Sequence, residues 1–319
     1  VAISGLNTVT LRSSISHAAF ADGVYGDCTV QVMDATGNAS DVLSASTFMV
    51  DATRPVISAS TVKATSASDQ GYIKKGDTYR VYANVVETGS GVMSITTDVS
   101  AATTGATAVA LVYDAVGFTI GGTTYHYASA LQTANPALSD GTKAYTIDAS
   151  DAATNAAIQA SGSVLADSMA PNDPDSDTVV MYDTPSMGVV LADNVWHRYD
   201  APHLMWMAPD DNPGTNSGVA GYYVCVDELD SCNPSVDGTF QAVTHYTLGA
   251  LTNGHTYYVR MKVVDTAGNT TSGATMFTYK YDSENPDASS ASVTDDGAWT
   301  NSTTALNASW GGFADNISV

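Results

Sequence analysis

Aspartate is the residue type through which this sequence could do chemistry, because carboxylates gathered in loops can hold hard cations such as calcium. The chain has 33 acidic and 11 basic residues, and only three of the acids are glutamates. The segment PNDPDSD (171–177) places Asp173, Asp175 and Asp177 at alternate positions. Thr178 and Thr184 stand where an EF-hand loop needs a glycine and a final acid, so that motif is excluded. The three aspartates are candidate calcium ligands, and a solvated acidic linker is the alternative.

Three further aspartates are candidate metal ligands because of their place before a recurring proline. Asp51, Asp167 and Asp282 stand four residues ahead of Pro55, Pro171 and Pro286. Calcium at such joints is one interpretation of the acidic composition. An acidic surface that keeps an exported or salt-adapted protein in solution is the other.

Sequence patterns of other chemistries are missing. The six histidines form no His-Glu-x-x-His motif, and the chain has no Gly-x-Ser-x-Gly elbow, phosphate loop or dinucleotide fingerprint. A carboxylate pair for glycoside hydrolysis could be drawn from thirty aspartates, but the scarcity of glutamate and the internal repeats argue against a catalytic cleft. The sequence predicts a protein that is not an enzyme, with calcium as its one expected cofactor.

Cysteine and asparagine supply candidate covalent modifications. Cys225 and Cys232 lie seven residues apart around an acidic turn, which favours a disulfide over two free thiols. Cys28 is left free or pairs outside this sequence. Candidate glycosylation sites are the sequons at Asn38, Asn269, Asn301, Asn307 and Asn316.

A repeated segment organises the chain. An alternating apolar run leads into Asp-x-x-Gly-Asn, then a second alternating run, then an aspartate and a proline. The copy from Asp34 to Pro55 and the copy from Asp265 to Pro286 both span 21 positions, and a degraded copy ends at Pro171. The three prolines are 116 and 115 residues apart, which suits one compact domain per interval. Each proline is expected to stop the last strand of one domain and direct the next.

Period-two alternation predicts antiparallel strands throughout these intervals, at 78–87, 93–99, 256–265 and 276–281. Signs of helix are scarce, so the predicted fold class is all-β, with tandem β-sandwiches. The expected domains are the later strands of one sandwich, two complete sandwiches and the opening strands of a fourth, at residues 1–55, 56–171, 172–286 and 287–319.

The interval 172–286 resembles the fibronectin type III family. Trp206 stands on an early strand, and Leu251 and Tyr257 lie six residues apart around an Asn-Gly turn, where the family more often has Pro-Gly. The resemblance implies a core tryptophan and a tyrosine whose hydroxyl bonds to nearby backbone. The interval 56–171 resembles bacterial and archaeal immunoglobulin-like repeats of surface proteins, through PVIS, KKGDTYRVYANVVE and the closing aspartate–asparagine segment.

These features predict an extracellular, non-catalytic structural protein, a repeat array of a surface layer, sheath, filament or adhesin stalk. A net charge of −22 excludes a nucleic-acid partner, and no apolar run is long enough to cross a bilayer. Self-association into a surface array or filament is expected. The incomplete ends indicate either that the sequence is a window on a longer tandem array or that the tail of one subunit donates strands to the head of the next. The alternatives are an adhesin module that binds glycan or protein and an accessory region of a secreted hydrolase.

Overall fold

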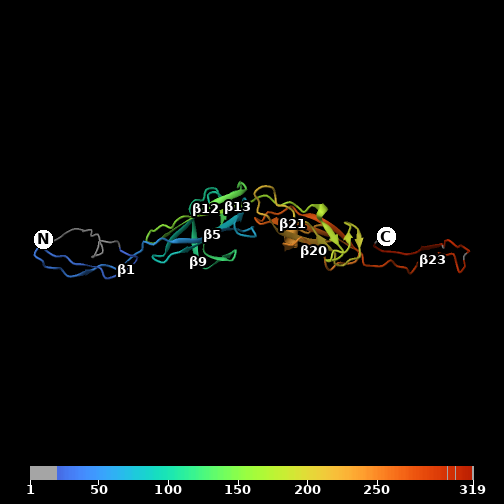
Figure 1. Cartoon of the computed structure of the whole chain (residues 1–319), viewed down its shortest axis with the longest axis horizontal. Coiled ribbons are helices and arrows are strands. Elements are labelled where there is room, and N and C mark those ends of the chain that lie inside the picture. The colour runs from blue at the N-terminus through green and yellow to red at the C-terminus, as the bar shows by residue number, and fades with distance from the viewer. Residues whose placement is uncertain (1–19, 300, 306, 318–319) are drawn as a thin grey trace. The chain divides into compact units, whose positions relative to one another are not determined.

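The structure is a computed structural model that describes residues 20–317 except 300 and 306 (Figure 1). The fold is all-β, as predicted, and the described residues contain only two short helical segments, η1 (Ser176–Thr178) and α1 (Pro234–Asp237). None of the described helices is long and apolar enough to span a membrane. The chain divides into two compact units, Val1–Asp167 and Ser168–Val319.

The first unit contains a nine-stranded β-sandwich. Strand β7 pairs with β5, β10 and β11, while β12 pairs with β8 and β13, and β9 joins the two halves. A Gly-Gly turn connects β9 to β10, and both glycines have positive φ, as the tight hairpin turn requires. The strands are β5 (Val56–Ala64), β6 (Tyr72–Ile73), β7 (Thr78–Val86), β8 (Val92–Asp98), β9 (Val109–Ile120), β10 (Thr123–Ser129), β11 (Gln132–Thr133), β12 (Gly141–Asp151) and β13 (Ala160–Ala166).

Alternation along these strands builds the first core, because every second side chain of a strand faces the same side of the sheet. Val81 of β7 and Ile147 of β12 are completely buried and belong to one apolar cluster. Tyr145 and Val164 lie in the same cluster, so the two halves of the sandwich enclose a single core.

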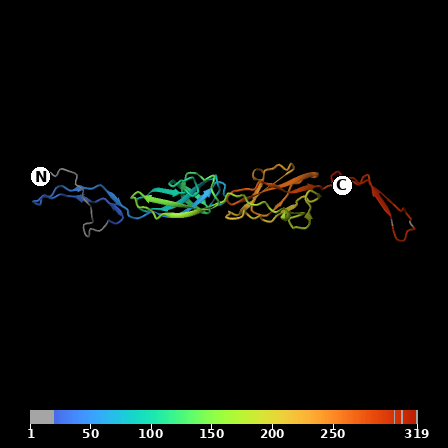
Figure 2. The ribbon, with the colours of Figure 1, turned by 90° about the horizontal axis from the view of Figure 1, so that it is seen from above.

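The second unit contains a sandwich of two separate sheets, ordered β15-β14-β17-β20 and β16-β22-β21-β18-β19. Figure 2 shows the long strands of this sandwich side by side. The strands are β14 (Val180–Tyr182), β15 (Val190–Leu191), β16 (Trp196–His197), β17 (His203–Met205), β18 (Val219–Asp227), β19 (Thr239–Gln241), β20 (His245–Thr247), β21 (His255–Asp265) and β22 (Ala274–Tyr281).

The second core lies between these two sheets. Trp206, immediately after β17, is 3% exposed and meets Tyr222 of β18 edge to face, with ring centroids 5.1 Å apart. Met181 and Leu204 from one sheet pack in the same cluster as Val259 from the other. The two cores fall within the predicted intervals 56–171 and 172–286.

Two hairpins extend beyond the sandwiches. In the first, β1 (Gly23–Tyr25) pairs with β4 (Phe48–Val50) and β2 (Thr29–Val30) with β3 (Leu43–Ser44), in one continuous antiparallel register. In the second, β23 (Ser292–Asp295) pairs with β24 (Ala308–Gly311). Leu43 and Trp310 are each more than 70% exposed, so these two-stranded hairpins present apolar side chains to solvent.

The repeated prolines have a constant place in the fold. Strands β4, β13 and β22 each end five residues before Pro55, Pro171 and Pro286, and an aspartate directly follows each strand. Pro55 and Pro171 are buried, whereas Pro286 is exposed. Each strand therefore ends just before its aspartate, so the prediction that the proline stops the strand is wrong, and the proline lies in the connection that follows.

The corner expected before β21 is formed by Leu251 and Tyr257. Leu251 packs against the second core, and the Thr252 N–H donates a 2.6 Å hydrogen bond to the hydroxyl oxygen of Tyr257. The tyrosine ring is buried, so this one hydroxyl ties the loop to the start of β21.

We expect Tyr257→Phe to lower the free energy of unfolding of the second sandwich by about 1 kcal/mol, because the ring stays packed and the bond to Thr252 is lost. Urea unfolding followed by circular dichroism measures this. Tyr258→Phe is the matched control, since Tyr258 is the neighbouring, half-buried tyrosine. Equal effects of the two substitutions would contradict the assigned role.

Candidate functional site

The repeated aspartate–asparagine segment forms the same turn three times. Asp151 accepts hydrogen bonds from the backbone N–H and the side-chain amide of Asn155, both at 2.8 Å. Asp265 accepts the corresponding pair from Asn269, both at 2.7 Å, and Asp34 accepts the pair from Asn38 at 2.9 and 3.0 Å. A β-bridge closes each turn one position outside the aspartate. We call this arrangement the Asp–Asn clamp.

The first sandwich places its clamp beside two other acids. Asp51 directly follows β4, Glu87 directly follows β7, and Asp151 ends β12. Each offers a carboxylate oxygen, and the three oxygens lie within 4.8 Å of one another. The Asp151 side chain is fully buried, and the other two are half-buried. We call this group the acid cluster.

Two hydrogen bonds from the sandwich hold Asp51 at the acid cluster. The backbone N–H of Ser90 donates to Asp51 Oδ2 at 2.7 Å, and the side-chain amide of Asn155 donates to the Asp51 carbonyl oxygen at 2.9 Å. Hydrogen bonds from Ser90 hold the pKa of Asp51 below its usual value. Gly89 makes this approach possible, since a Cβ there would lie 2.4 Å from Asp51 Oδ2.

Only one of the two carboxylate oxygens of Glu87 accepts a hydrogen bond from a described residue. Its Oε1 accepts a 2.6 Å hydrogen bond from the Gly89 N–H. Its Oε2 exposes less than 1 Å² and has no hydrogen-bond partner among the residues that the structure describes. Neither Glu87 nor Asp151 had been singled out from the sequence. The signal that could have found Asp151 was its place in the degraded repeat.

The other predicted metal ligands are placed as follows. Asp175 caps η1 by accepting from the Asp177 N–H at 3.0 Å, and Asp173 and Asp177 are exposed. These three do not form a three-carboxylate group among the described residues. Asp282 is buried, and its Oδ1 accepts from the Glu284 N–H at 3.0 Å.

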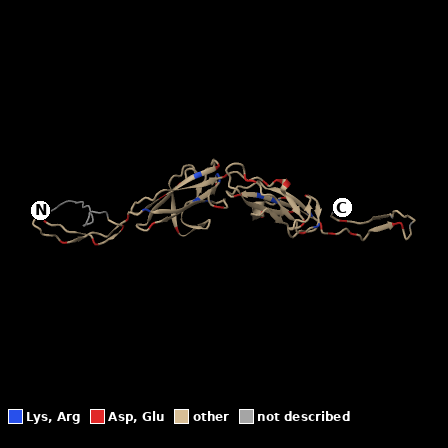
Figure 3. Cartoon of the chain, viewed as in Figure 1, with Lys and Arg blue, Asp and Glu red and all other residues tan. Residues whose placement is uncertain are grey.

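Buried acids recur at the corresponding places of the chain. Asp167 is fully buried, and its N–H donates to the Ile73 carbonyl oxygen at 2.9 Å. In the second sandwich, Asp211 and the clamp residue Asp265 bring carboxylate oxygens within 4.8 Å of each other. Acidic side chains are spread over the described chain, and basic ones are few (Figure 3).

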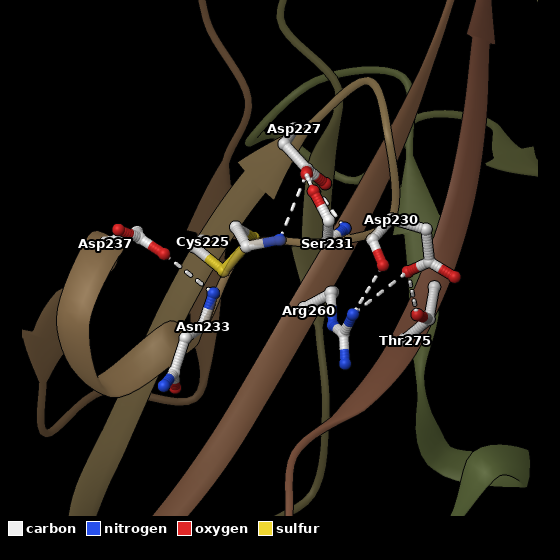
Figure 4. A network of polar contacts seen from close by, with 9 residues as sticks. Cys225, Asp227, Asp230, Ser231, Asn233, Asp237, Arg260 and Thr275 are labelled. Atoms are coloured by element: carbon white, nitrogen blue, oxygen red, sulfur yellow. Dashed lines mark hydrogen bonds and ion pairs between the residues drawn. A yellow bond between two sulfur atoms is a disulfide. The ribbon is translucent and has the colours of Figure 1, made fainter.

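Cys225 and Cys232 are joined by a disulfide, with Cα atoms 6.4 Å apart. Cys225 lies within β18, whereas Cys232 lies in the loop before α1. The disulfide therefore links a loop to a strand and does not join two strand ends. Asp227, the last residue of β18, accepts from the N–H groups of Ser231 and Cys232 at 2.9 and 3.0 Å, and Figure 4 shows it beside Ser231. Burial acts to raise the pKa of Asp227, but these hydrogen bonds lower it overall.

A second contact holds the same loop to the sheet. Arg260 of β21 donates to the Asp230 carbonyl oxygen at 2.5 Å and lies 3.7 Å from its carboxylate (Figure 4). Cys28 is a free cysteine.

The asparagines of the five sequons lie in two structural environments. The side-chain amides of Asn38 and Asn269 are bound within Asp–Asn clamps. Asn301, Asn307 and Asn316 are exposed in or beside the β23–β24 hairpin. Glycosylation at these five positions stays a prediction.

No protein-family model matches the sequence, and a search of curated proteins finds no match. Solved structures that it resembles include the fibronectin(III)-like modules of CbhA from Clostridium thermocellum, at 13% identity over 69% of this chain and 92% of that one, with a TM-score of 0.36. Others are the FN1-FN3 domains of chicken CNTN1 (10%, covering 79% and 77%, TM-score 0.34) and domains of titin (13%, covering 81% and 73%, TM-score 0.33).

The Asp–Asn clamp makes a prediction about acidity at Asp34. Hydrogen bonds from Asn38 and Thr36 hold the Asp34 pKa well below 3.8. Because the folded pKa is the lower one, the carboxylate stabilises the turn above the unfolded pKa, and this contribution is lost as the pH falls through the folded value. We expect Asn38→Ala to raise the Asp34 pKa toward 3.8 in a carbon-13 NMR titration.

Asp98 is the internal reference for that titration, because its pKa is lowered by Ser100 in the first sandwich. An Asp34 pKa that stays unchanged in the Asn38→Ala variant would contradict the clamp.

Proposed function

We propose that this chain is a non-catalytic, extracellular structural protein, a repeat array of immunoglobulin-like and fibronectin-like modules in a surface layer, sheath, filament or adhesin stalk. The observation that carries the proposal is the serial repetition of one design. Two sandwiches each have their own core, and each closes its last hairpin with the same Asp–Asn clamp. A protein that holds shape needs such modules in series, each of which keeps its fold when pulled.

The strand pairing supports a load-bearing role. In the first sandwich the last strand, β13, pairs in parallel with the early strand β6, and in the second β22 pairs in parallel with β16. When the two ends of a sandwich are pulled apart, a parallel pair of early and last strands is loaded in shear. Its hydrogen bonds then have to break together rather than one at a time.

The disulfide supports the extracellular location, because such bonds persist in oxidising compartments. It also fixes an acidic loop of the second sandwich, in which Asp230 lies 3.7 Å from Arg260 and the Asn233 side chain accepts a hydrogen bond from Lys262.

Self-association is part of the proposal and rests on the two outlying hairpins. Their exposed apolar residues would be covered if strands of a neighbouring copy packed on them. These residues are Val24, Val30, Val32, Met33, Leu43, Met49, Val293, Trp310 and Phe313.

The positions of three aromatic side chains bear on the alternative of an adhesin module. Tyr182 lies in β14, Trp196 lies in β16 beneath the ammonium of Lys280, and Tyr199 packs against the second core. All three are half-buried rather than gathered at a loop tip. This arrangement favours the structural role over recognition through an aromatic loop.

Pulling the chain from its two ends by single-molecule force spectroscopy tests the structural role. We expect two separate unfolding events, each lengthening the chain by about 40 nm, from about 3.6 Å for each of roughly 110 residues. Removing the disulfide with Cys225→Ala and Cys232→Ala assigns one event to the second sandwich, because that event alone should grow by about 2 nm. A single event of the combined length would contradict independent modules.

Sedimentation velocity over a range of concentrations tests self-association. We expect the wild-type chain to form larger species as its concentration rises, and Trp310→Ser to weaken this, since Trp310 is 71% exposed on β24. Trp299→Ser is the control, because Trp299 is exposed in the loop rather than on the paired strands. A wild-type chain that stays monomeric throughout would contradict this part of the proposal.

A further inference from the structure

The acid cluster joins two pieces of the fold that are otherwise held by few contacts. Asp51 belongs to the connection between the outlying hairpin and β5, whereas Glu87 and Asp151 belong to the sandwich. Asp51 is held to the sandwich by hydrogen bonds from Ser90 and Asn155. Any group that binds all three carboxylates would fasten the connection to the sandwich.

The charge of the acid cluster is not balanced by the protein. Three carboxylates approach within 4.8 Å, and no described residue forms a salt bridge with any of them. Two ion pairs of the described residues, His255–Glu228 and Arg260–Asp230, lie in the second sandwich, away from these three carboxylates. Like charges at such distances oppose one another unless a cation or a proton neutralises them.

A second, independent observation at the acid cluster is an oxygen that lacks a hydrogen-bond donor. Glu87 Oε2 is inaccessible to solvent and has no hydrogen-bond partner among the described residues. A buried carboxylate oxygen without a donor is unfavourable, so a native protein normally supplies a partner for it. Because the Glu87 carboxylate is part of the acid cluster, a ligand at the cluster would meet this need.

The donor set selects the class of ligand. All three side chains offer oxygen and none offers nitrogen or sulfur, which favours a hard cation over zinc or copper. Two oxygens on opposite sides of a calcium ion, each 2.3–2.6 Å from it, are about 4.6–5.2 Å apart, so carboxylate oxygens within 4.8 Å of one another are compatible with ligands of one calcium ion. Water would complete its six to eight ligands.

We propose that Asp51, Glu87 and Asp151 bind one calcium ion, which locks the connection after β4 to the first sandwich. The Asp–Asn clamp presents Asp151, and Gly89 leaves room for Asp51 to reach the ion. Binding would stiffen the joint in a medium that contains calcium and release it when calcium is removed.

The test uses the full chain, freed of divalent ions with a chelator and titrated with calcium chloride by calorimetry. We expect binding with a dissociation constant of roughly 10⁻⁴–10⁻³ M, the range of calcium-binding extracellular modules. Equilibrium dialysis counts the ions bound per chain. A wild-type chain that binds no calcium at 10 mM, or that binds magnesium more tightly than calcium, would overturn the proposal.

Two variants locate the site. Glu87→Gln and Asp51→Asn keep the side-chain shape and should each remove one bound ion per chain or weaken its binding at least tenfold. Asp148→Asn is the control, because Asp148 lies on the same strand β12 but bonds to Gln159 on the exposed face. Equal calcium binding by the wild type and by Glu87→Gln would overturn the proposal.

Amide hydrogen exchange provides a readout of the joint itself. Calcium should slow exchange of the Ser90 N–H, which donates to Asp51, in the wild type and not in Glu87→Gln. If calcium binds but leaves the exchange rate of the Ser90 amide unchanged, the ion is bound at another site and the proposal is wrong. Force spectroscopy in the presence of a chelator tests the two sandwiches without calcium. If calcium binding fails, the proposed structural role is therefore still tested by force spectroscopy.

Discussion

The repeated turns of this protein depend on one local constraint, the clamp between an aspartate and the asparagine four residues later. The carboxylate accepts the backbone N–H and the side-chain amide of the same asparagine in all three copies. This pairing fixes the turn between the last two strands of each sandwich, and in the first sandwich it also directs Asn155 to the connection at Asp51. In the first sandwich, one short motif therefore fixes the last turn and also binds the connection that precedes β5.

The clamp also explains how so acidic a chain remains folded. Exposed aspartates such as Asp34 are held ionised by local donors rather than by basic side chains, which are scarce. The apolar cores carry the stability of each sandwich, and the acids are kept at turns and strand ends. Where three acids meet, at Asp51, Glu87 and Asp151, the proposed calcium ion would balance their charge.

Much of the fold could be predicted from the sequence, because period-two alternation at 78–87 and 256–265 gives strands to within a residue or two of β7 and β21. The spacing of Leu251 and Tyr257 likewise indicated the corner. The β9–β10 hairpin was missed, although Gly121-Gly122 between alternating runs was a usable signal. Glu87 could not be predicted as a site residue, because only the folded chain brings it close to Asp51 and Asp151, which are distant from it in sequence.

The most direct test of the central claim is a double-mutant cycle on Asp151 and Asn155, measured by urea unfolding of the first sandwich in chelator. Single substitutions to alanine and their combination give the coupling free energy of the pair. The account predicts a favourable coupling of about 1–3 kcal/mol, as is typical of residues in one hydrogen-bond network. A coupling near zero would contradict it, because the turn would then hold its shape without the clamp.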